Sequence, residues 1–232
     1  MHLLDCKGVA SLLFGSIVEL ALRRPTLGRN RQLRLNRINS WMRTWYARHP
    51  GVHRLPALRL ANVRGDDGFA DLHGSVVKAA NTRASADLWK DFTIKFFNTG
   101  SDVDTTLQRM TADFAEVYSV LYGSPMFMTT DARNRVRALT IRVGEDWMRM
   151  REYGRVNSIL VFKVTPKVHK YQHLYLYCCL LNPRHIMTYS EESAMGTDAK
   201  VWRSAMRGQY GASAQSMVLA KRVVGLRLRL EE

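Results

Sequence analysis

Apolar residues recur at three- and four-residue steps along most of the chain, the spacing that places them on one face of an α-helix. The clearest run, about 102–122, predicts a helix capped by Ser101 and ended by Gly123-Ser124-Pro125. Its apolar positions are Leu107, Met110, Phe114, Val117, Tyr118 and Leu121. Further helices are predicted over about 8–22, 30–48, 74–97, 129–153, 166–181, 190–207 and 212–224.

Turn-forming residues are sparse, which favours helices over many short strands. The β-branched run 158–164 is the one internal candidate for a strand, and the alternating end 226–230 fits either a strand or a frayed tail. Residues 49–71 contain several turn signals and read as a linker. The pattern therefore predicts a mainly α fold, a bundle of about seven to eight helices. Residues 1–70 would form a basic helical arm and linker, and residues 71–232 a helical core domain.

The large positive charge of the chain indicates that this predicted helical bundle binds a polyanion. The 232 residues carry a net charge of +15, and the isoelectric point is about 10.2. The net charge is +10 over residues 1–64, zero over 65–199 and +5 over 200–232. A surplus of this sign attracts DNA, RNA or an anionic membrane surface. Arginine dominates the N-terminal surplus, and its planar fork suits phosphate contacts.

Two predicted helices carry the candidate phosphate-binding side chains. In helix 30–48 they alternate with Trp41 and Trp45, and in helix 129–153 they crowd the first half. Interleaved basic and aromatic residues can contact a nucleic-acid strand. The alternative is that the tryptophans pack inward and the arginines are merely solvated. The candidates are Arg31, Arg34, Arg37, Arg43, Arg133, Arg135 and Arg137.

Cysteine usage and the first apolar run bear on the compartment. Three cysteines, two of them adjacent, do not make a disulfide framework and indicate an intracellular reducing compartment, the nucleus included. The apolar run 8–22 is interrupted by Glu19 and is too short to predict a transmembrane segment. An Arg-rich, acid-poor start leaves organelle targeting as an alternative.

The residues from Pro166 to Gly196 hold the main candidates for site chemistry. His169 and His173 are four apart on a predicted helix and share a face, a spacing that metal ligands use. No glutamate follows His169, so the HExxH zinc motif is absent, and two hydrogen-bonded structural histidines are the alternative. Glu191 and Glu192 open a predicted helix, where acids are favoured by the helix dipole and where a carboxylate can also bind a divalent metal.

Four short motifs occur in an order that resembles the C-terminal half of eukaryotic DDE transposases of the Kyakuja-Dileera-Zisupton and Plavaka type. The similarity covers about residues 70–200. The motifs are Lys78-Ala79-Ala80-Asn81-Thr82-Arg83, Leu121-Tyr122-Gly123, Pro166-Lys167-Val168-His169 with His173, and Tyr189-Ser190-Glu191-Glu192 with Gly196.

The resemblance implies that the chain holds the helical insertion and last helix of an RNase H-like domain. Glu192 would then be the last member of a DDE triad, which binds Mg²⁺ or Mn²⁺ for DNA strand transfer or nuclease chemistry. Residues 1–70 do not read as the sheet that should carry the two partner aspartates, since Asp66 and Asp67 sit in a turn. A lone carboxylate cannot hold two metals, so the chain is not expected to be catalytically complete by itself.

The sequence therefore predicts a transposase-derived nucleic-acid-binding protein, with DNA favoured over RNA. One alternative is a basic structural protein associated with RNA or the ribosome, because Arg-rich arms on small helical bodies fold on binding RNA. A second alternative is a membrane-surface protein that uses residues 8–48 as an amphipathic basic segment.

Overall fold

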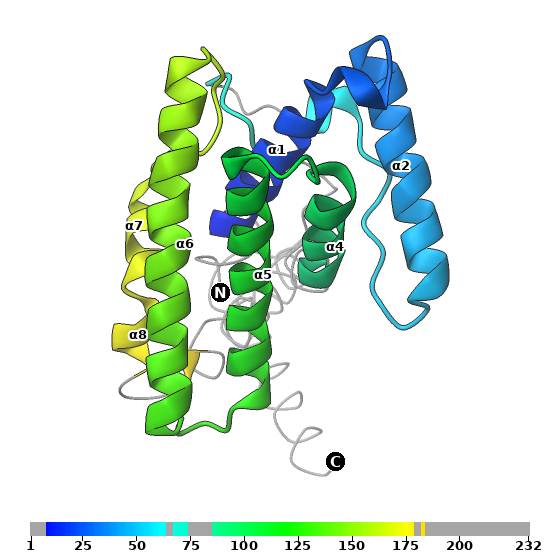
Figure 1. Cartoon of the computed structure of the whole chain (residues 1–232). Helices are drawn as coiled ribbons and strands as arrows, with labels where there is room; N and C mark the ends of the chain where they lie inside the picture. Colours follow the sequence, from blue (N-terminus) through cyan, green and yellow to red (C-terminus); the bar gives the residue numbers. More distant parts are fainter. Residues whose placement is uncertain (1–7, 64–66, 74–84, 179–181, 184–232) are drawn as a thin grey trace, which may run out of the picture. The chain divides into compact units, whose positions relative to one another are not determined.

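The structure, a computed structural model, describes residues 8–63, 67–73, 85–178 and 182–183 (Figure 1). This part of the chain contains seven α-helices, two short 3-10 helices (Pro25–Leu27 and Leu60–Asn62) and no β-strand, which confirms the mainly α fold. None of the described helices is both long and apolar enough to span a bilayer. The helices predicted over 190–207 and 212–224 and the alternating end 226–230 lie outside the described residues.

Helix α1 (Val9–Leu22) is a central helix of the fold rather than part of an arm. All 14 of its residues are buried, and it contacts α2 (Arg31–Arg48), α4 (Ala86–Phe96) and α7 (Pro166–Gln172). All of these helices belong to one compact unit, Met1–Ile186. The sequence placed residues 1–70 apart because of their charge and the turn signals of residues 49–71, but the apolar α1 packs against α4 and α7 of the later part.

Two long helices, α5 (Asp102–Gly123) and α6 (Thr130–Val156), run antiparallel side by side (Figure 1). Both begin at a hydroxyl cap: Ser101 accepts from the Asp104 N–H, as predicted, and Thr129 accepts from the Ala132 N–H. Three arginine–carboxylate pairs cross between the helices, each through two hydrogen bonds. They are Arg109–Asp146, Arg142–Asp113 and Arg135–Glu116.

Aromatic rings fill the core around α1. Phe14 stacks on Trp89 of α4 with ring centroids 4.8 Å apart, and its edge meets Phe114 of α5 at 5.8 Å. Gly15, the next residue of α1, lies against the backbone of Asp71, where an added Cβ atom would come within 2.5 Å of the Asp71 Cα. The segment 67–73 can therefore cross α1 only because position 15 has no side chain.

The segment after α6 is not a strand. The Phe162 backbone is left-handed (φ 50°), a rare conformation for a bulky residue. Its N–H donates to Ser16 Oγ at 2.8 Å, and its carbonyl accepts from Trp147 Nε1 at 3.0 Å. The backbone of Phe162 is thus hydrogen-bonded to side chains of α1 and α6 and not to a neighbouring strand. The predicted helix 166–181 is likewise divided, into α7 and the four-residue α8 (Leu174–Tyr177), with His173 at the junction.

Candidate nucleic-acid interface

Helix α2 packs beside α1 and α4 (Figure 1), and one of its own faces is exposed to solvent. The Asn30 side chain caps it by accepting from the Leu33 N–H, and the apolar positions Leu35, Ile38 and Met42 are buried. Trp41 meets the rings of Phe92 and Phe96, and Trp45 donates from Nε1 to Asp91. Both tryptophans are therefore used for packing, so the arginines, and not an aromatic and basic mixture, define the exposed face.

Residues 20–63 contain ten arginines and no acidic residue, but four of the ten are used inside the protein. Arg23 and Arg31 pair with Glu19 of α1, at 2.9 and 2.7 Å, and Arg24 pairs with Asp104 of α5. Arg34 donates to the carbonyls of Leu22 and Gly28, both at 2.7 Å, and so satisfies the end of α1 and the turn that follows it. Arg31 and Arg34, both predicted to bind phosphate, thus hold α2 onto α1.

The buried carboxylate of Glu19 explains why two arginines converge on it. Glu19 is only 2% exposed. Burial by itself would raise its pKa, but the hydrogen bonds and charges of Arg31 and Arg23 outweigh burial and hold the pKa below the ordinary value of 4.5. Asp104 behaves in the same way: burial is outweighed by hydrogen bonds from Thr99 and Arg24, which lower its pKa. Both carboxylates therefore stay charged at neutral pH.

Replacing Arg31 with leucine is expected to lower the free energy of unfolding by about 1–2 kcal/mol at pH 7. This loss is smaller than that expected for a fully buried ion pair, because Arg31 is 37% exposed and Arg23 still pairs with Glu19 in the variant. The folded-state pKa of Glu19 lies below its unfolded-state value. Its stabilisation is thus complete above about pH 4.5 and is lost as the pH falls through the lowered pKa.

Urea denaturation of wild type and R31L at pH 7 and pH 3 measures this contribution. The difference in the free energy of unfolding should shrink at pH 3, because the protonated Glu19 no longer needs a cation. Groups common to both proteins cancel in this difference, including Asp71, whose pKa burial raises. An equal difference at the two pH values would show that Arg31 acts through packing alone.

The other six arginines of residues 20–63 form the candidate interface, called here the α2 surface. They are Arg29, Arg37, Arg43, Arg48, Arg54 and Arg59. Across the part of the chain that the structure describes, none of these side chains has a carboxylate within ion-pair distance. Three of them make only neutral contacts: Arg37 with the Thr26 carbonyl, Arg43 with Ser40 Oγ and Arg48 with the Thr44 carbonyl.

A groove of about 410 Å³ runs between α2 and the return segment 49–63. Asn39 exchanges two hydrogen bonds of 2.9 Å with the Leu58 backbone, and the Tyr46 hydroxyl accepts from the Leu55 N–H. These contacts hold the return segment beside the helix. The groove is lined by Asn36, Asn39, Ser40, Met42, Arg43, Tyr46, Leu55 and Ala57, so it offers amide, hydroxyl and guanidinium groups and no carboxylate.

The arginines at the start of α6 are less available. Arg135 is paired with Glu116 at 2.6 and 2.8 Å, the Arg137 guanidinium lies 5.1 Å from the centre of the Tyr175 ring, and Arg133 donates to Thr130 Oγ1. The structure therefore divides the seven predicted phosphate-binding residues. Arg37 and Arg43 lie on the α2 surface, while Arg31, Arg34 and Arg135 are engaged within the fold. Arg133 and Arg137 form a separate, smaller group on α6.

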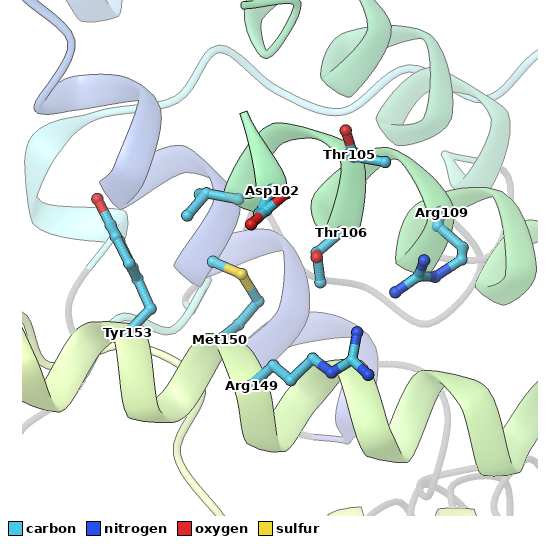
Figure 2. A pocket seen from close by; sticks show the side chains of 8 residues that line it. Asp102, Thr105, Thr106, Arg109, Arg149, Met150 and Tyr153 are labelled. Atoms are coloured by element: carbon cyan, nitrogen blue, oxygen red, sulfur yellow. The ribbon is translucent and has the colours of Figure 1, made fainter. Parts of the chain in front are cut away.

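A second hollow, of about 420 Å³, lies between the first turns of α5 and the second half of α6 (Figure 2). Arg109 and Arg149 face it from one end, and Asp102 and Tyr153 stand at the other. Arg109 is already paired with Asp146 at 2.8 Å. Because the lining mixes acidic and basic groups, this hollow has no net attraction for a polyanion comparable to that of the α2 surface.

The two predicted metal-binding histidines are described by the structure, but the predicted catalytic Glu192 is not. The rings of His169 and His173 lie 4.8 Å apart and both side chains are exposed. Among the described residues no group of three or more His, Cys, Asp or Glu side chains is arranged to hold a metal. Glu192 and Glu191, like the motif Lys78–Arg83, lie outside the described residues. The structure therefore describes two of the four transposase-like motifs, at the end of α5 and over α7.

Sequence reasoning missed four arginines of the α2 surface and two neutral residues of the groove. They are Arg29, Arg48, Arg54 and Arg59, with Asn36 and Ser40. The absence of any acid over residues 20–63 was a usable signal, since no local partner can neutralise these arginines. Comparison with models of known protein families, with curated proteins and with solved structures found no match, so the geometry of the α2 surface is what bears on function.

Proposed function

We propose that the protein binds nucleic acid through the α2 surface. The observation that carries this proposal is the set of six arginines on one helix, its preceding turn and its return segment, with no carboxylate partner among the described residues. Exposed guanidinium groups without carboxylate partners on neighbouring segments repel one another, and a phosphate backbone relieves that repulsion. Arginine also matches phosphate with two parallel hydrogen bonds, which a lysine cannot make.

The packing of α1 favours nucleic acid over a membrane surface. Insertion at a membrane interface requires an exposed apolar face, and every residue of α1 is buried against other helices. At a membrane surface, α2 would therefore have to bind through its positive charge alone, without an apolar face of α1 to insert into the lipid. Binding by α2 does not depend on the transposase resemblance, because it involves none of the residues of those motifs.

The test is fluorescence anisotropy with labelled duplex DNA, single-stranded DNA and RNA over a salt series. Wild type is compared with the variant R37Q/R43Q/R48Q. Each phosphate contact contributes about 0.9 to the slope of log affinity against log salt on duplex DNA. Loss of three arginines should therefore reduce the magnitude of that slope by about two to three.

The matched control is R133Q/R149Q/R151Q, which removes the same charge from α6. We expect its slope to change by less than about one, because the general attraction of the basic protein is reduced without loss of direct contacts. Equal losses in the two variants would show that net charge and not the α2 surface is responsible. Undetectable binding of wild type to all three probes at about 0.15 M salt would remove the proposal.

A further inference from the structure

On the exposed face of α2, short side chains lie along the middle and arginines lie along the two margins. On a helix of 3.6 residues per turn the exposed positions form one stripe about 160° wide. These positions are Gln32, Leu33, Asn36, Arg37, Ser40, Arg43, Thr44, Ala47 and Arg48. The stripe runs almost the whole length of the 18-residue helix, about 27 Å at 1.5 Å per residue.

Small side chains occupy the middle of this stripe. Ser40, Ala47 and, in the first turn, Leu33 lie near its centre, with Thr44 on one side and Asn36 on the other, so beyond the first turn the middle holds only small or short side chains. From position 36 onward the helix backbone can therefore approach a partner closely along this line. The same positions offer hydroxyl and amide groups that hydrogen-bond with base edges, and Leu33, 42% exposed, offers an apolar contact.

Arginines stand at both margins of the stripe. Arg37 and Arg48 lie on the margin next to Trp41 and α4, and Arg43 lies on the opposite margin at the groove. The return segment, which adds Arg54 and Arg59, packs on the side of Arg43, as the contacts of Asn39 and Tyr46 show. A partner suited to this face carries negative charge along two lines, with hydrogen-bonding groups between them.

We infer that α2 is a recognition helix that enters the major groove of duplex DNA. This rests on the nucleic-acid binding proposed above and specifies the form of the ligand. The major groove is about 12 Å wide, admits an α-helix and is bordered by two phosphate backbones. The marginal arginines Arg37, Arg43 and Arg48 contact those backbones, and Asn36 and Ser40, which lie between the margins, reach the base edges. Asparagine pairs with adenine in such contacts, and a serine hydroxyl hydrogen-bonds with any of the bases.

Filling the major groove while leaving the phosphates unchanged tests this directly. The probe is one duplex made in two forms, with cytosine or with glucosylated 5-hydroxymethylcytosine. The added sugar projects into the major groove from the same ring position as the thymine methyl group. Wild type should bind the glucosylated duplex at least about tenfold more weakly, since the loss of one or two base contacts amounts to that factor.

A bulky side chain in the middle of the stripe gives a second test without a change of charge. We expect S40F to lower affinity for the unmodified duplex by about tenfold, and to remove most of the difference between the two duplexes. The matched control is S119F, at an exposed serine of α5, which should bind within about twofold of wild type. Circular dichroism establishes that both variants are folded.

The outcomes separate this inference from the proposal on which it rests. Equal affinity for the two duplexes, or tighter binding of single-stranded DNA or RNA than of duplex, would overturn the recognition helix and leave nucleic-acid binding intact. Equal effects of S40F and S119F would also overturn it. Failure to bind any of these probes would overturn both.

Discussion

Replacing Trp147 with alanine is expected to lower the free energy of unfolding by about 3–5 kcal/mol. The ring is 1% exposed, its edge meets Phe162 with centroids 5.4 Å apart, and its Nε1 donates to the Phe162 carbonyl. That hydrogen bond is one of two that hold Phe162 in a left-handed conformation, which costs roughly 1–3 kcal/mol. Alanine would leave a large cavity and release this strained turn together. Urea denaturation measured by circular dichroism gives the change.

The variant W147F separates packing from the hydrogen bond. Phenylalanine keeps most of the buried area but cannot donate to the Phe162 carbonyl, so a loss of about 1–2 kcal/mol is expected. If W147F were as unstable as W147A, the hydrogen bond and not the ring volume would dominate. If W147A lost less than about 1 kcal/mol, Trp147 would not be the packing centre between α6 and the segment after it.

Replacing Gly15 with alanine is expected to destabilise the protein by about 2–3 kcal/mol, although alanine is the better helix former. Helix propensity alone would favour the change by about 1 kcal/mol. However, the new Cβ atom would lie 2.5–2.7 Å from three backbone atoms of Asp71. Backbone cannot rotate away as a flexible side chain can, so the segment 67–73 must move. Its hydrogen bond from the Leu72 N–H to the Ser11 carbonyl, 3.0 Å long, would then be weakened.

G123A provides the control for this prediction, measured by the same denaturation. Gly123 ends α5, and an added Cβ atom there would meet nothing within 4 Å. We expect the control to be neutral or stabilising by up to about 1 kcal/mol. A stabilising effect of G15A would mean that the segment 67–73 does not press on α1 as the structure has it.

The amphipathic pattern was sufficient for the long helices. The predicted helices 30–48, 102–122 and 129–153 correspond to α2, α5 and α6, and the predicted cap Ser101 is confirmed. Local physics suffices there because periodic apolar positions and a capping hydroxyl lie within a few residues of one another. The segment 158–164 was expected to be a strand. Its β-branched residues fit an extended chain, but no neighbouring strand exists in the described residues for it to pair with.

The sequence by itself determined the helical class, the positive charge and its concentration before residue 64. The tertiary structure alone decided which arginines are free. Arg24 meets Asp104, 80 positions away, and Arg31 meets Glu19 only because α2 folds back on α1. Such pairs depend on distances that no local pattern encodes. Arg37, Arg43 and Arg48 belong to the same arginine-rich, acid-free stretch as the paired arginines. They stay available for a partner because no carboxylate of the described residues lies within ion-pair distance of them.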